Sequence, residues 1–315
     1  MAARKPSCRE LTASLALAAL ATVAAGCGDR RTADADLGSL VLEKTDEVKP
    51  VDVKAAGTNV GEFRRALAIP HTRIAATLGA HKVVGSSSVK VTAEGQVVTD
   101  LSDKTSIVID AEGNYMATAD NSRDYGRHAI YTGGELFLRP RFGKYHRRAP
   151  ANTSEPGAIL DEMFSTSNAY FDLLYARVEL SLRGDERAGD RAARKIDFKI
   201  APAPSDRDSE TLAHKKWRES ISVESAAGWV LLDLDGGFAL AADIAGTITF
   251  VKEGKQFTME VRAQHAIEDI GADVAIAAPA PSETVATPMM RTEVDEQTQL
   301  LEGLERVRPS GDAKK

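Results

Sequence analysis

The sequence contains little cysteine, few aromatic residues and no long block of basic charge. Only Cys8 and Cys27 occur among its 315 residues, so the chain cannot build a framework of several disulfides. Aromatic side chains are 5% of the residues, which leaves few rings on which bases or sugars could stack. The formal net charge is -6, and an acidic chain without a basic block is unsuited to binding nucleic acid.

The apolar stretch near the start is too short to span a bilayer. Residues 11–26 carry no charge, and they reach about four-fifths of the roughly 20 residues that a membrane-spanning helix needs. The basic residues Arg4, Lys5 and Arg9 precede this stretch, and small residues end it. A basic start, a short apolar run and small residues before a cut site are the parts of a secretory signal.

The residues Ala24-Ala25-Gly26-Cys27 at the end of this stretch resemble the bacterial lipobox. The resemblance implies that residues 1–26 are removed and that the thiol of Cys27 receives a diacylglycerol, which anchors the protein to a membrane. In such lipoproteins an acidic residue after the cysteine favours the inner membrane, and Gly28 stands there instead. We therefore expect a protein of the cell envelope, anchored in the outer membrane and facing the periplasm. A plain secreted protein, cut near the same point, is the alternative.

Composition divides the remaining chain into three parts. Residues 27–60 are rich in Asp, Glu, Lys, Thr and Ala with little periodicity, and they are expected to form a flexible tether. Residues 61–280 are the expected folded body. Residues 281–315 continue a Pro/Ala/Thr-rich linker into a charged tail, in which 293–308 could form a short helix.

Most of the body alternates between apolar and polar residues, as in 195–200 and 256–264. This period of two predicts strands with one buried face and one wet face, which is typical of antiparallel pairing. Turn sequences such as Glu94-Gly95, Gly133-Gly134 and Glu253-Gly254 separate the runs. Their close spacing predicts a meander of about eight to ten strands.

Residues 157–182 differ, because their apolar positions recur every three or four residues and predict one long amphipathic helix. Shorter helices are expected over 61–67 and 71–78. A helix is about 10 Å wide and covers only two or three strands, each about 4.8 Å from the next. We therefore predict an α+β fold, in which a curved antiparallel sheet wraps as a half-barrel around one long helix and one or two short ones.

Two stretches, GWVLLDLDGGFALAADIAGTITFVKEGKQFTMEV (228–261) and HAIYTGGELFLRPRFGKYHRR (128–148), resemble strand-turn-strand passages of LolA/LolB-like and LppX-like lipoproteins. The resemblance covers most of residues 61–280. It implies a curved half-barrel closed by helices, which carries lipids, glycolipids or the acyl chains of other lipoproteins. It carries over no catalytic signature.

Two sets of residues are candidates for contacting such a ligand. The first set is apolar and would line the interior of the half-barrel; it comprises Ile159, Met163, Phe164, Phe171, Leu232, Phe250 and Phe257. The second set is basic and would meet anionic headgroups at the rim; it comprises Arg139, Arg141, Lys144, Arg147 and Arg148. The alternatives are that the first set only fills the core and that the second is a solvated strand end.

The sequence presents no signature of an enzyme, a metal site or a cofactor site. The six histidines form no HExxH pattern, and GSSSV (85–89) lacks the spacing of a nucleophile elbow. DLDGG (233–237) begins like a calcium loop, but Ile244 stands at its twelfth position, so a hairpin turn is expected there.

The sequence therefore predicts a non-catalytic, membrane-anchored envelope lipoprotein that binds a lipid or an acyl chain in an apolar half-barrel cavity, as a carrier or a sensor. The alternative is an envelope scaffold with a filled core, which would bind another envelope protein through its wet face or its C-terminal helix.

Overall fold

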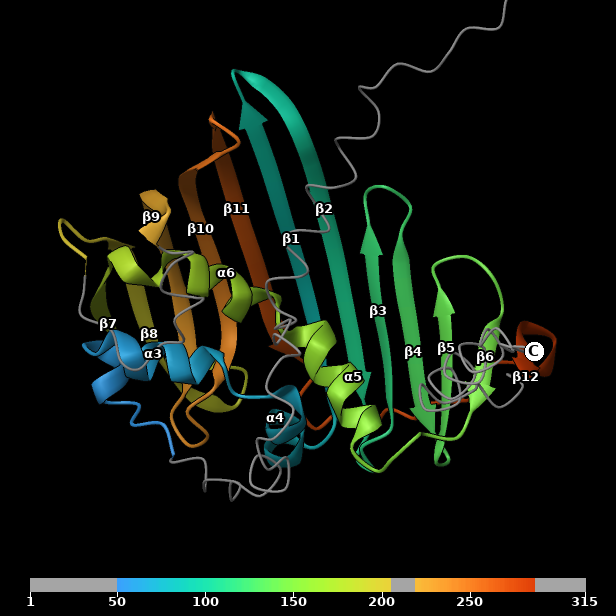
Figure 1. The fold of residues 1–315 in the computed structure, drawn as a ribbon. Helices are drawn as coiled ribbons and strands as arrows, with labels where there is room; N and C mark the ends of the chain where they lie inside the picture. The colour runs from blue at the N-terminus through green and yellow to red at the C-terminus, as the bar shows by residue number, and fades with distance from the viewer. Residues whose placement is uncertain (1–49, 205–218, 287–315) are drawn as a thin grey trace, which may run out of the picture.

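The part of the chain that the structure describes folds as a single curved sheet of twelve strands with α-helices across one of its faces (Figure 1). A computed structural model describes residues 50–204 and 219–286. The strand order is β12-β6-β5-β4-β3-β2-β1-β11-β10-β9-β8-β7, and every pairing is antiparallel except β12 with β6. The predicted α+β class and the curved antiparallel sheet are confirmed, with two more strands than the upper expectation.

Five of the strands are 13 or 14 residues long and form the middle of the sheet, while the strands toward the β12 edge are short. The strands are β1 (His81–Ala93), β2 (Gln96–Ile109), β3 (Tyr115–Asn121), β4 (Gly126–Thr132), β5 (Glu135–Pro140), β6 (Tyr145–Arg148), β7 (Val178–Ala188), β8 (Arg191–Ile200), β9 (Ile221–Asp233), β10 (Ala239–Lys252), β11 (Lys255–Glu268) and β12 (Thr284–Ala286).

The described helices lie before β1 and between β6 and β7, apart from the short η3 between β11 and β12. They are η1 (Ala55–Gly57), α3 (Val60–Leu67), α4 (His71–Leu78), α5 (Glu155–Phe164), α6 (Thr166–Leu174), η2 (Tyr175–Arg177) and η3 (Pro281–Glu283). The two short helices predicted before β1 are confirmed as α3 and α4.

The hairpin turns lie where the turn residues predicted them. Glu94 and Gly95 join β1 to β2 with positive φ angles of 51° and 78°. Glu253 and Gly254 join β10 to β11 in the same way, with 53° and 74°. Two central residues with positive φ match the right-handed twist of the flanking strands, which keeps these long hairpins in register.

The single long helix predicted over 157–182 is wrong. The chain forms two helices, α5 and α6, which meet at Ser165, and it enters β7 at Val178. The hydroxyl of Ser165 donates to the carbonyl of Glu162 at 2.9 Å, and such side-chain bonds compete with helix hydrogen bonds. From Val178 onward the backbone pairs with β8, opposite Ile200, because the sheet supplies the hydrogen bonds that a longer helix would.

The packed body begins earlier and ends later than expected. Val51 and Val53, which the sequence assigns to the tether, pack against the core, and Ala56 is fully buried. At the other end, residues 284–286 of the expected linker pair with β6 as strand β12. The expected leader, Cys27 and the expected helix over 293–308 lie outside the described residues.

The core lies between the sheet and the helices, on what we call the helix-covered face. Beneath α3 and α6, the rings of Phe63, Phe171 and Phe198 meet edge to face with centroids 5.0–6.1 Å apart. A second apolar cluster, which includes Ile74 and Ile107, lies beneath α4 and α5. Burying aromatic edges against faces adds about 1 kcal/mol per pair to the gain from area.

Gly246 on β10 allows α6 to approach the sheet. A Cβ atom at this position would lie 2.4 Å from a methyl carbon of Leu174 and 2.8 Å from the backbone oxygen of Ser225. Because real Cβ contacts are never this short, only glycine lets the helix lie at its present depth.

Candidate functional site

The apolar residues predicted to line a cavity fall into three groups. Phe171 and Leu232 are 0% exposed and Met163 is 5% exposed, so these three fill the core. Two others, Ile159 and Phe164, are half-buried at the second cluster. The remaining two are half-buried near the tip of the β10–β11 hairpin; they are Phe250 and Phe257.

The long central strands extend past the helices that cover them. Strand β10 has 14 residues and spans about 46 Å, whereas α6 has 9 residues and spans about 14 Å. Figure 1 shows the helices over the lower half of the sheet, while β1, β2, β10 and β11 rise beyond them toward the top of the view. Among residues 50–204 and 219–286, no helix therefore covers this face near the strand tips.

Half-buried apolar side chains occupy this uncovered end of the helix-covered face. They come from four neighbouring strands. Ile221 on β9 pairs with Phe250 on β10, and Phe250 pairs with Phe257 on β11. Phe257 in turn pairs with Ala93 on β1, and Val91 lies two residues before Ala93 on the same face. The rings of Phe250 and Phe257 stack in parallel, with centroids 5.3 Å apart and 9° between their planes. We call this surface the apolar ledge; it comprises Val89, Val91, Ile221, Phe250 and Phe257.

A buried histidine pair lies at the opposite end of β1, where α4 meets the sheet. The Nε2 atoms of His71 and His81 are 3.0 Å apart, and Nδ1 of His81 is 2.7 Å from the carbonyl oxygen of Gly79. A carbonyl can only accept, so Nδ1 of His81 carries the proton and donates it. Nε2 of neutral His81 then accepts from Nε2–H of His71. Nδ1 of His71 is left as an acceptor, and it has no partner in the described structure.

A third histidine, His265 on β11, completes this buried cluster. The ring of Phe164 lies between the two groups, 4.4 Å from His71 and 5.2 Å from His265 in centroid distance. Ser167 on α6 lies 2.8 Å from Nδ1 of His265. Burial, with smaller effects of His81 and His265, lowers the pKa of His71 to about 3. Burial also lowers the pKa of His265 to about 4, so both imidazoles are neutral near pH 7.

The histidine cluster was missed at the level of sequence because its members are far apart in the chain. A signal was nevertheless present. His265 stands in phase with Val261, Ala263 and Ile267 on the buried face of β11, a position where an apolar residue is expected. A histidine at a strand position where the alternation predicts a buried apolar residue indicates a buried polar group.

The basic residues predicted at a rim are divided between the two faces of the sheet. Arg148 turns toward the helices, where it donates to Glu155 of α5 at 2.8 Å and thereby lowers the pKa of that carboxyl group. Arg147 faces the other way and lies 3.7 Å from Glu135. Neighbours on a strand point to opposite faces, which separates these two charges. Lys144 lies in the turn between β5 and β6 and is exposed.

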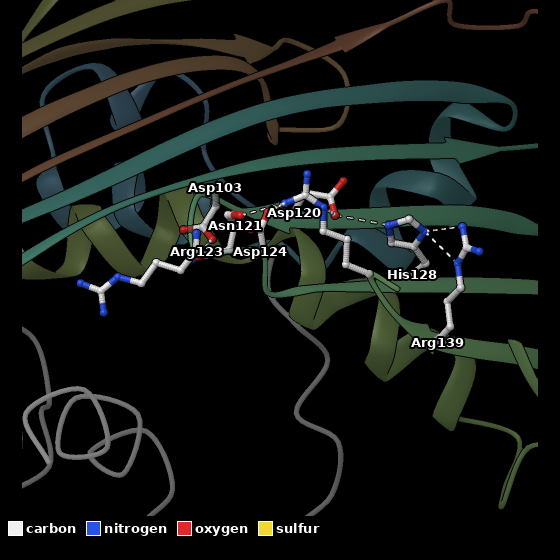
Figure 2. Close-up of polar contacts among 8 residues, drawn as sticks. Asp103, Asp120, Asn121, Arg123, Asp124, His128 and Arg139 are labelled. Carbon is white, nitrogen blue, oxygen red and sulfur yellow. Dashed lines mark hydrogen bonds and ion pairs between the residues drawn. The ribbon is translucent and has the colours of Figure 1, made fainter. Parts of the chain in front are cut away.

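Arg139 and Arg141 belong to a polar network around Asp120 on the outer face, the side away from the helices. Figure 2 shows Arg139, His128 and Asp120 of this network. Arg139 donates to Nδ1 of His128 at 3.1 Å, and its guanidinium lies 4.2 Å from the ring centroid of Tyr145. Nδ1 therefore accepts, and Nε2–H of neutral His128 donates to Asp120 at 3.3 Å. Both ring nitrogens are engaged, so His128 presents no free base in this arrangement.

Arg141 closes the other side of the network. It donates to the backbone oxygen of Asn121 at 3.1 Å and to Asp124 at 3.2 Å, and it lies 3.5 Å from Asp120. On the helix-covered face, the amide of Asn121 donates to Asp103 at 2.9 Å. These arginines tie β3, β4 and β5 together through side chains, and the charge of Arg141 is offset by Asp120 and Asp124.

Over residues 50–204 and 219–286, no group of three or more His, Cys, Asp or Glu side chains is arranged to hold a metal ion. Within the same ranges, no helix is both long and apolar enough to cross a membrane.

No family model and no curated protein matches the chain. Among solved structures, LprF from Mycobacterium bovis is 16% identical, with 71% of this chain and 100% of that chain covered and a TM-score of 0.27. A putative outer membrane lipoprotein-sorting protein domain from Vibrio parahaemolyticus is 10% identical, with 69% and 95% covered and a TM-score of 0.22. A LolA superfamily protein from Nitrosomonas europaea is 9% identical, with 65% and 89% covered and a TM-score of 0.19.

Proposed function

We propose that this chain is an envelope lipoprotein, anchored through Cys27, that binds an acyl chain of a lipid along the apolar ledge. The observation that supports the proposal is the ledge itself: a row of half-buried apolar side chains where the long strands extend past α6. Its five residues carry no charge and no hydrogen-bonding side chain, so the ligand part that fits them is a hydrocarbon.

The driving force would be the burial of methylene groups against the ledge. Each methylene removed from water contributes about 0.8 kcal/mol, so a chain with ten methylenes in contact gains on the order of 8 kcal/mol before the cost of ordering it. The stacked rings of Phe250 and Phe257 form a flat wall on one side. Tyr170 and Leu173 of α6, which pack against the same apolar cluster, stand at the helix end of the ledge.

This proposal changes the role of part of the predicted lining. Phe250 and Phe257 would touch the ligand directly. Met163, Phe171 and Leu232 would hold α5 and α6 on the sheet, because they are buried within the packed core.

Native mass spectrometry on the full chain with Cys27→Ser tests the proposal. The substitution removes the predicted acylation site, so any acyl chain found on the protein is a ligand. We expect the folded protein to carry one lipid after release from detergent, and to lose it in Phe250→Asn. The matched control is Val251→Asn, because Val251 is the next residue on β10, faces the outer side and is 67% exposed.

A folded protein that carries no lipid and takes up no fluorescent fatty acid would contradict the proposal. That result would instead support a scaffold with a filled core. Equal lipid occupancy in the Phe250→Asn and Val251→Asn variants would also contradict it, since the lipid would then lie elsewhere.

A further inference from the structure

A groove crosses the outer face of the sheet, on the side opposite the apolar ledge. It has a volume of about 580 Å³ and is lined by residues of β1, β2, β3, β9, β10 and β11. Its direction follows from the strand register, because its lining residues are cross-strand partners. Six strands separated by about 4.8 Å give it a length of about 24 Å, perpendicular to the strands.

Two parallel rows of side chains build the groove. The floor is a row of small or compact residues paired across five strands; they are Ala241, Ala266, Val84, Ser106 and Thr118. The adjacent row is polar with a tryptophan at one end; it comprises Trp229, Asp243, Gln264, Ser86, Lys104 and Asp120. Small side chains beside longer ones make the depression.

The polar row is held in place by contacts that leave hydrogen-bonding capacity open. Asp243 accepts from the amide of Gln264 at 2.8 Å and from Arg262 at 2.9 Å. A carboxylate has about four lone-pair sites, so Asp243 retains acceptor capacity toward the groove. Asp120, at the far end, is oriented by Arg141 and by His128, whose contact with Asp120 is drawn in Figure 2.

The charges along the groove nearly cancel. The negative charges of Asp120 and Asp243 are offset by Arg141 and Arg262, which contact them. Lys104 adds a positive charge, and the described structure records no ion pair for it. A balanced row does not select a polyanion or a polycation. The row offers hydrogen-bond donors and acceptors one after another across the strands, which suits a chain bearing many hydroxyl groups.

The tryptophan provides the remaining element of recognition. Trp229 is half-buried at one end of the groove, and the ammonium of Lys195 lies 5.3 Å from its ring centroid. An indole offers a large apolar surface with one polar edge, which suits the C–H face of a sugar ring. An extended peptide is less suited, because strand addition needs a free sheet edge and this groove crosses strands whose backbones are already paired.

We propose that this groove binds a neutral, linear polysaccharide across the outer face of the sheet. The site is independent of the apolar ledge, since the two lie on opposite faces. A polysaccharide of the cell envelope would then be held on one face while a lipid occupies the other.

Fluorescence titration tests the site in the full chain with Trp217→Phe, which leaves Trp229 as the sole tryptophan. The probes are N-acetylglucosamine hexamer and maltohexaose, both neutral and linear. We expect saturable quenching by at least one of them. Calorimetry with the native tryptophans should show affinity weakened at least about tenfold in Trp229→Ala.

Two further variants separate loss of the site from loss of the fold. Lys104→Ala changes an exposed groove residue and should weaken binding with an unchanged melting temperature. Phe142→Ala is the aromatic control, since Phe142 is 66% exposed and lies outside the groove; it should bind like the parent. Absence of saturable binding by both probes would overturn the proposal. Unchanged affinity in Trp229→Ala and Lys104→Ala, or binding of an extended peptide in place of both sugars, would do so too.

Discussion

Mild acid should destabilise this protein through the buried histidine cluster. His71 and His265 are neutral in the folded chain, with pKa values of about 3 and about 4, while an unfolded histidine has a pKa of 6.5. The unfolded chain therefore binds more protons than the folded chain below pH 6.5. The free energy of unfolding falls as the pH drops through 6.5, and it continues to fall until the folded pKa values are reached.

The magnitude follows from the same values. One pKa unit is worth about 1.4 kcal/mol, so lowering the pH from 7 to 5 costs about 2 kcal/mol for each of the two histidines. Together they should remove about 4 kcal/mol, a large part of the 5–15 kcal/mol that typically holds a domain folded. Burial lowers the pKa of His81 as well, which acts in the same direction.

Urea unfolding at pH 7 and pH 5, at constant ionic strength, measures this effect. The comparison is with the double variant His71→Gln, His265→Asn, in a Cys27→Ser background for both chains. The Asn side chain can accept from Ser167 near the position of Nδ1, and Gln can still donate to His81. We expect the parent to lose about 4 kcal/mol more than the variant between the two pH values. An equal loss in the two chains would refute the neutral, buried state of these imidazoles.

Two predictions concern the packing and the polar contacts of the fold. Gly246→Ala should lower the free energy of unfolding by about 1–3 kcal/mol, because its methyl group would overlap Leu174 and a backbone oxygen; an unchanged urea midpoint would show that α6 can move outward freely. Asp233→Asn should lower the free energy of unfolding by about 3 kcal/mol. Asp233 is fully buried, and it accepts hydrogen bonds from Arg191 at 2.5 and 2.7 Å and from the backbone amide of Gly236. A melting curve in calorimetry that matches the parent would contradict this role.

The sequence predicted the hairpin turns and the buried faces of the strands, because residues close together in the chain determine both. The hairpins at Glu94-Gly95 and Glu253-Gly254 require positive φ, and the alternation in 195–200 and 256–264 records which face is buried. The helix over 157–182 was extended too far because Val178 continues the helical spacing. Its strand state depends on pairing with Ile200, which lies 22 residues away and leaves no mark on the local pattern.

In the candidate site, too, the sequence predicted what neighbouring residues determine and missed what depends on distant contacts. Phe250 and Phe257 were recognised as apolar and inward-facing, but their half-buried state depends on how far α6 reaches over the sheet. Arg147 and Arg148 were grouped because they are adjacent in the sequence. The period of two along β6 places them on opposite faces, an inference that the sequence already allowed.

Over the described residues the sheet is open and has two edges, and the unpaired backbone of an edge strand could pair with a strand of another molecule. At one edge stands β12, which has 3 residues and offers a very short template. At the other edge β7 carries alternating charges, including Arg183 and Asp185, and a register shift between Leu182 and Gly184 distorts it. A neighbouring molecule that added a strand along β7 would have to align with a bulged backbone and bury these charges. The protein can thus expose a broad sheet to neighbouring molecules without edge-to-edge aggregation.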